Sequence, residues 1–431
     1  MRNLRSFIAM ILLVSLLLVF FYSSLHLEMT HSHRAAINKK PTEGPLSIQD
    51  QVQVQVQDQV QNQVQVRESI TVPHLEVQNI SDSFKQAIPQ NGAYWNRLLY
   101  SALKNQGIGG NSSRRDSDWS SCKVVHQEVL RLNVHDFNLY NFLFQDFVQG
   151  MGCRTPPVLI NVPKKCVSAG GDKNGEKLLL FAIKSTPGHF ERRQAVRETW
   201  GEEGVKQSGL RVRTVFLMGS HQADDPDLSP LLSFESQLFG DILQWDFQES
   251  FLNLTLKMNV LLQWTLQHCA HVNFVFSGDD DVFVNTPLLL SYLQSLDSTK
   301  ASKLYSGHVI STASPIRDPK SKYYIPLSFY DGPYPAYVGG GGLLISGALL
   351  RPLYSVSHVI PFYPIDDVYT GMCFKAIGVS PEIHPGFHTF DLKEADRENV
   401  CVHKDLILIH KRSPQEIKRL WRGIHSPFLT C

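Results

Sequence analysis

Three consecutive aspartates, Asp279, Asp280 and Asp281, follow an apolar segment in HVNFVFSGDDDVFVN. The apolar segment predicts a buried strand, and α/β sheets bind their ligands at the carboxyl ends of strands. Two of these carboxylates can share one hard cation. Oxygen ligands suit Mg2+ or Mn2+, which keep open positions for phosphate oxygens. We interpret the triplet as a metal site. The alternative is a solvated acidic turn in which one aspartate caps the next helix.

The spacing around this triplet excludes two other kinds of acidic site. An EF-hand loop needs a third oxygen ligand at position 283 followed by glycine, but the chain has Phe283 and Val284. A haloacid-dehalogenase-like phosphatase needs Thr or Val four residues after its nucleophilic aspartate, and Phe283 stands there instead. An acidic group between two apolar segments also needs a counter-charge, which favours a metal over a solvated turn.

A second acidic pair, Asp366 and Asp367, precedes a helical pattern that ends near Gly378 in YPIDDVYTGMCFKAIG. We expect one aspartate to cap this helix, which leaves the other free for chemistry. A helix N-terminus keeps a carboxylate ionised and able to accept a proton, but it also weakens the base. His410 ends the apolar segment LILIH, which predicts a last strand. A histidine there is more often structural, although imidazole accepts Mn2+ more readily than Mg2+.

The four glycines at 339–342 form a predicted turn that lacks the Lys and Ser/Thr of a phosphate-binding P-loop. One interpretation is a flexible loop. The other is a close backbone approach to a ligand at Gly341 and Gly342, with the rings of Tyr334 and Tyr337 stacked on a sugar.

Arg193 and Arg197 are four residues apart in HFERRQAVRETWG and therefore share one face of a predicted helix. They either pair with Glu191 and Glu198 or bind an anion. The sequence leaves both possibilities open.

Charge and cysteine content exclude further classes of protein. The 431 residues carry 41 Lys and Arg against 40 Asp and Glu. The chain therefore lacks the excess of positive charge that is typical of nucleic-acid-binding proteins. None of the seven cysteines forms a C-x-x-C pair, which excludes zinc-ribbon and thioredoxin-like spacings. Scattered cysteines fit at most three disulfides in an oxidising compartment. The odd thiol either pairs with another chain or stays buried.

The N-terminus predicts a membrane anchor. Arg2 and Arg5 precede an uncharged apolar segment from Phe7 to Tyr22, which as a helix spans about 24 Å. We assign 1–6 to a cytoplasmic tail and 7–25 to a signal anchor. No A-x-A-like site follows, which argues against the alternative of a cleaved signal peptide. The arginines predict a lumenal C-terminal part, and the short anchor indicates a single-pass type II protein of the Golgi membrane.

The composition divides the rest of the chain into three parts. Residues 26–90 are polar and include QVQVQVQDQVQNQVQV, which predicts a solvated stem, and 91–175 are aromatic-rich and expected to pack on the catalytic domain. Residues 176–431 alternate strand and helix patterns, which predict an α/β fold with a mixed, largely parallel central sheet. The predicted strands are 178–183, 212–217 and 273–276, the predicted helices are 254–269 and 288–296, and glycosylation sequons occur at Asn79, Asn111 and Asn253.

Five segments between Leu178 and Cys431 together resemble the Golgi β-1,3-glycosyltransferase family, most closely its branch of N-acetyllactosaminide β-1,3-N-acetylglucosaminyltransferases. They are AIKS with ERRQAVRETWG, FSGDDDVFVN, YPAYVGGGGLLIS, YPIDDVYTGMC and LILIH. The resemblance implies a GT-A type nucleotide-sugar-binding fold. It also implies Mn2+-dependent transfer from a UDP-sugar, with inversion at the anomeric carbon.

The resemblance also implies roles for individual residues. Asp279, Asp280 and Asp281 correspond to the acids that hold metal and nucleotide, with Asp281 the direct ligand, and His410 corresponds to the family's terminal metal-binding histidine. Asp367 corresponds to the general base, with Asp366 as its capping or sugar-binding partner. Arg193 and Arg197 fall in the segment that contacts the uridine or the phosphates.

The acidic pair reads Asp-Asp rather than the Glu-Asp of the galactosyltransferase branch. This implies GlcNAc transfer from UDP-GlcNAc to the 3-hydroxyl of a terminal galactose, on N-acetyllactosamine-type glycans of a glycoprotein or glycolipid. One alternative is a β-1,3-galactosyltransferase that uses UDP-Gal. A second is a lumenal glycan-binding protein that has lost catalysis. A homo-oligomer and a hetero-oligomer are both compatible with the sequence.

Overall fold

A computed structural model describes residues 79–106, 119–123, 130, 132–167, 177–206, 209–221 and 225–431. The predicted tail, the anchor at 7–25, most of the stem and the sequon at Asn111 lie outside these residues. Within the described ranges, no helix has both the length and the apolar character needed to cross a membrane. Of the other two sequons, Asn79 is exposed, whereas the partly buried Asn253 donates a hydrogen bond from its amide to the Gln248 carbonyl.

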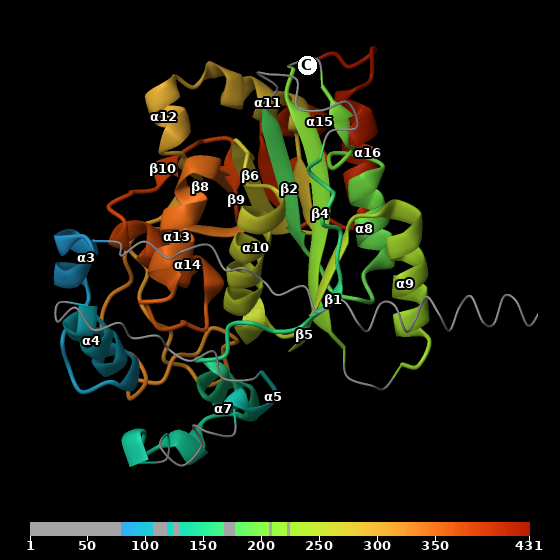
Figure 1. Ribbon diagram of the computed structural model, residues 1–431. Helices are drawn as coiled ribbons and strands as arrows, with labels where there is room; N and C mark the ends of the chain where they lie inside the picture. Colours follow the sequence, from blue (N-terminus) through green and yellow to red (C-terminus); the bar gives the residue numbers. More distant parts are fainter. Residues whose placement is uncertain are drawn as a thin grey trace, which may run out of the picture. The chain divides into compact units, whose positions relative to one another are not determined.

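A nine-stranded sheet forms the centre of the described residues (Figure 1). Its order is β1 (Val158–Ile160), β5 (Ile242–Gln248), β4 (Arg211–Ser220), β2 (Leu178–Lys184), β6 (Phe274–Asp279), β9 (Tyr337–Ser346), β8 (Tyr305–Ile310) and β10 (Glu382–Ile383), with β3 (Gly204–Val205) beside β4. A small sheet contains β11 (Phe387–His388), β12 (Leu408–His410) and β7 (Val282–Val284). The predicted strands at 178–183, 212–217 and 273–276 are confirmed as β2, β4 and β6.

The sheet is mixed, as predicted, but less parallel than expected. The run β5-β4-β2-β6 is parallel, and so is the pair of β8 and β10. The pairs β1 with β5, β3 with β4, β6 with β9 and β8 with β9 are antiparallel. The expectation of a largely parallel sheet was wrong because the glycine-rich segment, predicted as a turn, is itself the antiparallel strand β9.

Helices alternate with strands between β2 and β6, as an α/β chain predicts. Helix α10 confirms the pattern at 254–269, and α11 confirms that at 288–296. The α-helices are α3 (Asp82–Ala87), α4 (Tyr94–Gln106), α5 (Trp119–Cys122), α7 (Phe142–Gly150), α8 (Phe190–Arg197), α9 (Leu228–Phe239), α10 (Leu254–His268), α11 (Thr286–Ser295), α12 (Ser298–Ser302), α13 (Leu350–Ser357), α14 (Asp366–Ala376), α15 (Val400–Lys404) and α16 (Pro414–Ile424). Short 3-10 helices are η2 (Phe137–Leu139), η3 (Phe251–Asn253), η4 (Gly347–Leu349) and η5 (Glu394–Asp396).

Strand β2 is buried on both faces and separates two hydrophobic cores. Because side chains alternate along a strand, Leu178, Leu180 and Ala182 face the core that includes α10, α13 and α14. Leu179, Phe181 and Ile183 face the core of α8, α11 and α16. The unbroken apolar segment is therefore the signature of a central parallel strand, and its carboxyl end is held rigidly from both sides.

The aromatic-rich N-terminal helices contact the segment that leads into α14. Trp95 of α4 is fully buried, and its indole N–H donates to the carbonyls of Pro361 and Phe362. Its ring also packs edge-on against Tyr330 and Tyr363. These contacts fix the chain four to five residues before Asp366, so α4 supports the N-terminus of α14.

All seven cysteines lie in the described residues. Six form the disulfides Cys122–Cys153, Cys166–Cys269 and Cys401–Cys431, which is the maximum of three that the sequence predicted. Cys373 of α14 remains free and is buried, and burial raises the pKa of its thiol to about 12. The structure therefore favours a buried, unreactive odd thiol over pairing with another chain.

The disulfide that joins Cys166 to Cys269 closes a sequence separation of 103 residues. Replacing both cysteines by Ala should lower the free energy of unfolding by about 4 to 5 kcal/mol, because the unfolded chain regains the freedom of a long loop. Guanidinium unfolding followed by Trp fluorescence measures this loss. Cys373→Ala is the matched control, with an expected loss of about 1 kcal/mol. Equal losses in the two variants would contradict this account.

Candidate active site

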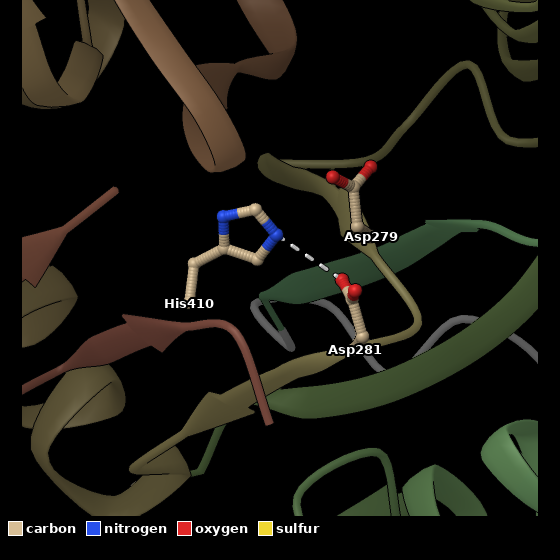
Figure 2. A group of neighbouring side chains, drawn as sticks. All are labelled: Asp279, Asp281 and His410. Atoms are coloured by element: carbon tan, nitrogen blue, oxygen red, sulfur yellow. Dashed lines mark ion pairs between the residues drawn. The ribbon is translucent and has the colours of Figure 1, made fainter. Parts of the chain in front are cut away.

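The acidic triplet lies where the main sheet meets the small sheet. Asp279 ends β6, and the chain turns through Asp280 and Asp281 into β7. Because β7 pairs antiparallel with β12, His410 lies opposite Val282, next to Asp281. The ligand atoms of Asp279, Asp281 and His410 lie within 4.8 Å of one another. Figure 2 shows the imidazole of His410 turned toward the Asp281 carboxylate. The three residues predicted as metal ligands therefore surround one point.

This cluster has the chemistry of a divalent-cation site. His410 Nδ1 lies 3.1 Å from the Thr389 carbonyl oxygen, and Nε2 lies 3.3 Å from Asp281 Oδ1. Burial opposes a charged ring, but hydrogen bonding to Asp281 and its charge raise the pKa of His410. Burial would likewise raise the pKa of Asp281, but His410 and Arg192 lower it. The carboxylates thus attract positive charge, and two carboxylates with an imidazole fit Mn2+.

A lysine joins the two acidic motifs. Lys184 ends β2, in parallel register with Asp279. Its ammonium lies 3.1 Å from Asp279 Oδ1 and 3.0 Å from Asp366 Oδ2. Burial disfavours the charged ammonium, but the charges of Asp279, Asp366 and Asp367 raise the pKa of Lys184 well above its ordinary value. Lys184 is therefore a permanent cation that holds the start of α14 against the end of β6.

Asp280 is not part of the group formed by Asp279, Asp281 and His410, and it contacts residues at the start of α8. Its carboxylate accepts from the Ser185 hydroxyl at 2.7 Å, and it lies 2.8 Å from His189 Nδ1 and 3.1 Å from Arg192 Nη1. Arg192 also lies 3.3 Å from Asp281 Oδ2. The triplet is therefore divided, because Asp280 anchors the segment after β2 while its neighbours face His410.

The structure corrects the expected cap of α14. The N-cap residue is Ile365, without a side-chain cap hydrogen bond, and Asp366 and Asp367 are the first two residues of the helix. The expectation of an aspartate cap was wrong because the Asp366 carboxylate binds Lys184 instead. Burial and the charge of Asp366 raise the pKa of Asp367 well above its ordinary value, although Lys184 and the Gly340 backbone lower it. Asp367 is consequently a stronger base than an exposed aspartate.

The glycines at 339–342 belong to β9 rather than to a turn, so the predicted flexible loop was wrong. Their missing side chains leave room for the site. A Cβ at Gly340 would lie 3.0 Å from Asp367 Oδ2, and one at Gly341 would lie 3.2 Å from His410 Cβ. At Gly342 an added Cβ would overlap Leu408 and Phe276. Glycine at 340 and 341 therefore lets the strand pass close to both Asp367 and His410.

Comparison with known proteins identifies the family. The galactosyltransferase family profile matches residues 191–385. The chain is 44% identical over 351 residues to mouse N-acetyllactosaminide beta-1,3-N-acetylglucosaminyltransferase 2, covering 79% of this chain and 86% of that protein. It is 39% identical over 354 residues to mouse UDP-GlcNAc:betaGal beta-1,3-N-acetylglucosaminyltransferase 8, covering 82% and 86%. The chain belongs to the galactosyltransferase family, alongside these β-1,3-N-acetylglucosaminyltransferases.

Solved structures resemble this galactosyltransferase-family chain only weakly. A glycosyltransferase involved in the glycosylation of the major capsid of PBCV-1 aligns with a TM-score of 0.28 and 14% identity, over 56% of this chain and 98% of that chain.

The range 191–385 that the family profile matches contains the acidic triplet, the glycine strand and the acidic pair, whereas Lys184 and His410 lie outside it. The tertiary structure brings these two residues to the same site.

In this galactosyltransferase-family chain, Arg193 and Arg197 form a buried ion-pair network behind the site. Arg193 has no exposed surface and binds Glu235 at 2.6 Å, while Arg197 binds Glu235 and Asp241, each at 2.7 Å. Their partners are thus neither of the glutamates that the sequence suggested, since Glu198 pairs with Lys418.

Arg193 supports the site indirectly. It donates to the carbonyls of Thr186 and Pro187, and so holds the turn that leads from Lys184 into α8. Arg192, its neighbour in sequence, faces the aspartates.

Sequence reasoning missed the basic residues of this site. Lys184 is the last residue of β2, and His189 and Arg192 come shortly after it, at the start of α8. A signal for them exists, because β2 and β6 were both predicted as buried strands, and parallel neighbours place their carboxyl ends at one edge of a sheet. A charged residue directly after either strand is therefore a candidate for the site.

Glu235→Gln removes the carboxylate that Arg193 and Arg197 share. The variant should lose about 3 to 5 kcal/mol of stability, because the buried guanidinium of Arg193 and the partly buried one of Arg197 lose a charge partner. Thermal or guanidinium unfolding measures the loss. The matched control is Glu191→Gln on the exposed face of α8, which should change stability by less than about 0.5 kcal/mol. Unchanged stability together with lost UDP binding would instead favour direct donor contacts from these arginines.

Proposed function

We propose that this chain is a GT-A type, inverting β-1,3-N-acetylglucosaminyltransferase that uses Mn2+. It transfers GlcNAc from UDP-GlcNAc to the 3-hydroxyl of a terminal galactose on N-acetyllactosamine-type glycans. The observation that carries the proposal is the Lys184 bridge, which joins the cluster of Asp279, Asp281 and His410 to the pair Asp366-Asp367. The name of one relative, 39% identical, states a UDP-GlcNAc donor and a β-galactose acceptor.

The residues divide the work of transfer between two elements. Asp279, Asp281 and His410 would hold the cation at the end of β6. When bound, such a cation offsets the negative charge that builds on the leaving diphosphate. Asp367, at the start of α14, takes the proton from the attacking galactose 3-hydroxyl. Its raised pKa, due to burial and to Asp366, suits it to accept a proton during the reaction.

Further residues orient the donor sugar beside the metal and the base. Lys184 keeps Asp366 beside the metal acids, so Asp366 is placed to contact the donor sugar near the base. The backbone of Gly341 and Gly342 is the proposed contact surface for the donor, between the metal-binding residues and the acidic pair.

The basic tail and apolar segment at 7–25 support a type II protein of the Golgi membrane with a lumenal catalytic domain. Asn79 is exposed, as a glycosylated residue in that compartment requires.

A donor and acceptor screen tests the proposal. The full lumenal part is incubated with labelled UDP-GlcNAc or UDP-Gal and a galactose-terminated lactosamine acceptor, with Mn2+ or with EDTA. We expect transfer from UDP-GlcNAc with Mn2+ and none with EDTA. Asp367→Asn should lower turnover by about 10² to 10⁴, because the base is lost, yet retain UDP binding in isothermal titration calorimetry.

Two outcomes of this screen would favour the alternatives. Use of UDP-Gal alone would identify a β-1,3-galactosyltransferase. Glycan binding that survives Asp367→Asn, without transfer from either donor, would identify a binding protein that has lost catalysis.

The pH dependence of transfer depends on Lys184. Asp367 accepts a proton only when it is ionised, so kcat/KM should rise with pH as this carboxylate loses its proton. The positive charge of Lys184 lowers the pKa of Asp367. Lys184→Gln removes that charge and raises this pKa, so the rising limb should move to higher pH. The measurement is a pH profile at saturating Mn2+.

Lys206→Gln is the matched control, since Lys206 pairs with the exposed Glu202 away from the site. Its profile should coincide with that of the wild type. A limb that moved to lower pH in Lys184→Gln would contradict the assignment of Asp367 as the base.

A further inference from the structure

Thr389 hydrogen-bonds His410 on one side and, on the other, the glycine strand that lies against Asp367. It directly follows β11, which runs parallel to β12 with His388 paired to Ile409. Thr389 therefore comes next to His410 and to the glycine strand. Its hydroxyl donates to the Gly340 carbonyl at 2.7 Å, and its own carbonyl lies 3.1 Å from His410 Nδ1.

The carbonyl of Thr389 determines which nitrogen of His410 faces the carboxylates. A carbonyl oxygen can only accept, so Nδ1 must carry the proton that it shares with Thr389. Nε2 is the nitrogen on the other side, 3.3 Å from Asp281 Oδ1. A backbone acceptor of this kind orients a metal-binding imidazole and selects its tautomer.

The hydroxyl of Thr389 acts on the other half of the site. The Gly340 backbone hydrogen-bonds Asp367, and a Cβ at Gly340 would lie 3.0 Å from its Oδ2. Gly341 follows at φ 99°, a conformation that glycine adopts readily. Four consecutive glycines have no side chains with which to hold their own peptides in place. The bond from Thr389 to the Gly340 carbonyl is therefore a restraint on the peptide against which Asp367 lies.

We propose that Thr389 is a positioning residue that couples the metal-binding histidine to the general base. Its carbonyl orients His410, and its hydroxyl fixes the Gly340 peptide beside Asp367. The inference rests on the proposed function for its catalytic consequence, but the restraint itself is a property of the fold. Only the hydroxyl is open to substitution, because every residue supplies the carbonyl.

The test compares Thr389→Val, which keeps the shape and the carbonyl, with Thr389→Ser, which keeps the hydroxyl. Thr389→Val should lower kcat about three- to tenfold, the effect of one lost hydrogen bond. The KM for UDP-GlcNAc should stay within about twofold of wild type, and so should Mn2+ affinity in the presence of UDP, read by electron paramagnetic resonance. Thr389→Ser should restore kcat to within about twofold of wild type.

Thr214→Val is the matched control. Thr214 makes the same kind of bond, from its hydroxyl to the Gly201 carbonyl at 2.7 Å, on β4. Its loss should lower the melting temperature but leave kcat unchanged. If Thr389→Val lowered kcat, Mn2+ affinity and melting temperature together, and Thr389→Ser failed to restore them, Thr389 would be structural only. An unchanged kcat in Thr389→Val would also overturn the inference.

Hydrogen exchange makes the test independent of catalysis. Mass spectrometry of a peptide that spans 337–346 should show faster amide exchange in Thr389→Val and wild-type exchange in Thr389→Ser. If the wild type transferred no sugar, the proposed function would fail, and the exchange data would still decide whether Thr389 restrains the glycine strand. Equal exchange in all three proteins would refute that restraint.

Discussion

The ion pairs of Lys184 connect the strand that ends at Asp279 to the helix that begins with Asp366 and the proposed base, Asp367. Five carboxylates, Asp279 to Asp281 and Asp366-Asp367, gather at one edge of the sheet, and such a cluster is unstable without counter-charge. Lys184 supplies part of that charge to Asp279 and Asp366. Arg192 supplies it to Asp280 and Asp281. The five carboxylates can therefore gather at this edge without a bound cation.

The same edge also needs space, and strand β9 provides it by lacking side chains. A sheet strand normally projects a side chain toward each face. At Gly340 and Gly341 no side chain stands in the way of Asp367 and His410, which an added Cβ would approach to 3.0 and 3.2 Å. Side chains from other elements must then hold the glycine backbone in place, and the Thr389 hydroxyl bonds the Gly340 carbonyl. Likewise, Trp95 of α4 holds the segment that precedes α14.

Local patterns in the sequence predicted the strands and singled out the residues that cluster at the site, but contacts distant in sequence could not be predicted from them. The buried strands β2, β4 and β6 and the helix α10 follow from apolar patterning, which is a local property. The glycines were misassigned because their place in a strand depends on β6 and β8, far away in sequence. The cap of α14 failed for a similar reason, since Lys184 competes for Asp366. Arg193 and Arg192 are adjacent, and only packing shows which one faces the site.

The proposed base, Asp367, illustrates how tertiary structure resolves a conflict that local sequence leaves open. At the start of α14, the helix dipole stabilises the ionised carboxylate and so weakens it as a base. Burial and the neighbouring Asp366 act in the opposite direction and prevail, because they raise the pKa of Asp367 well above its ordinary value. Lys184 limits this rise. Asp367 is thus second in the helix, behind a partner that is already paired with Lys184, and its pKa is raised by burial and Asp366 and lowered by Lys184.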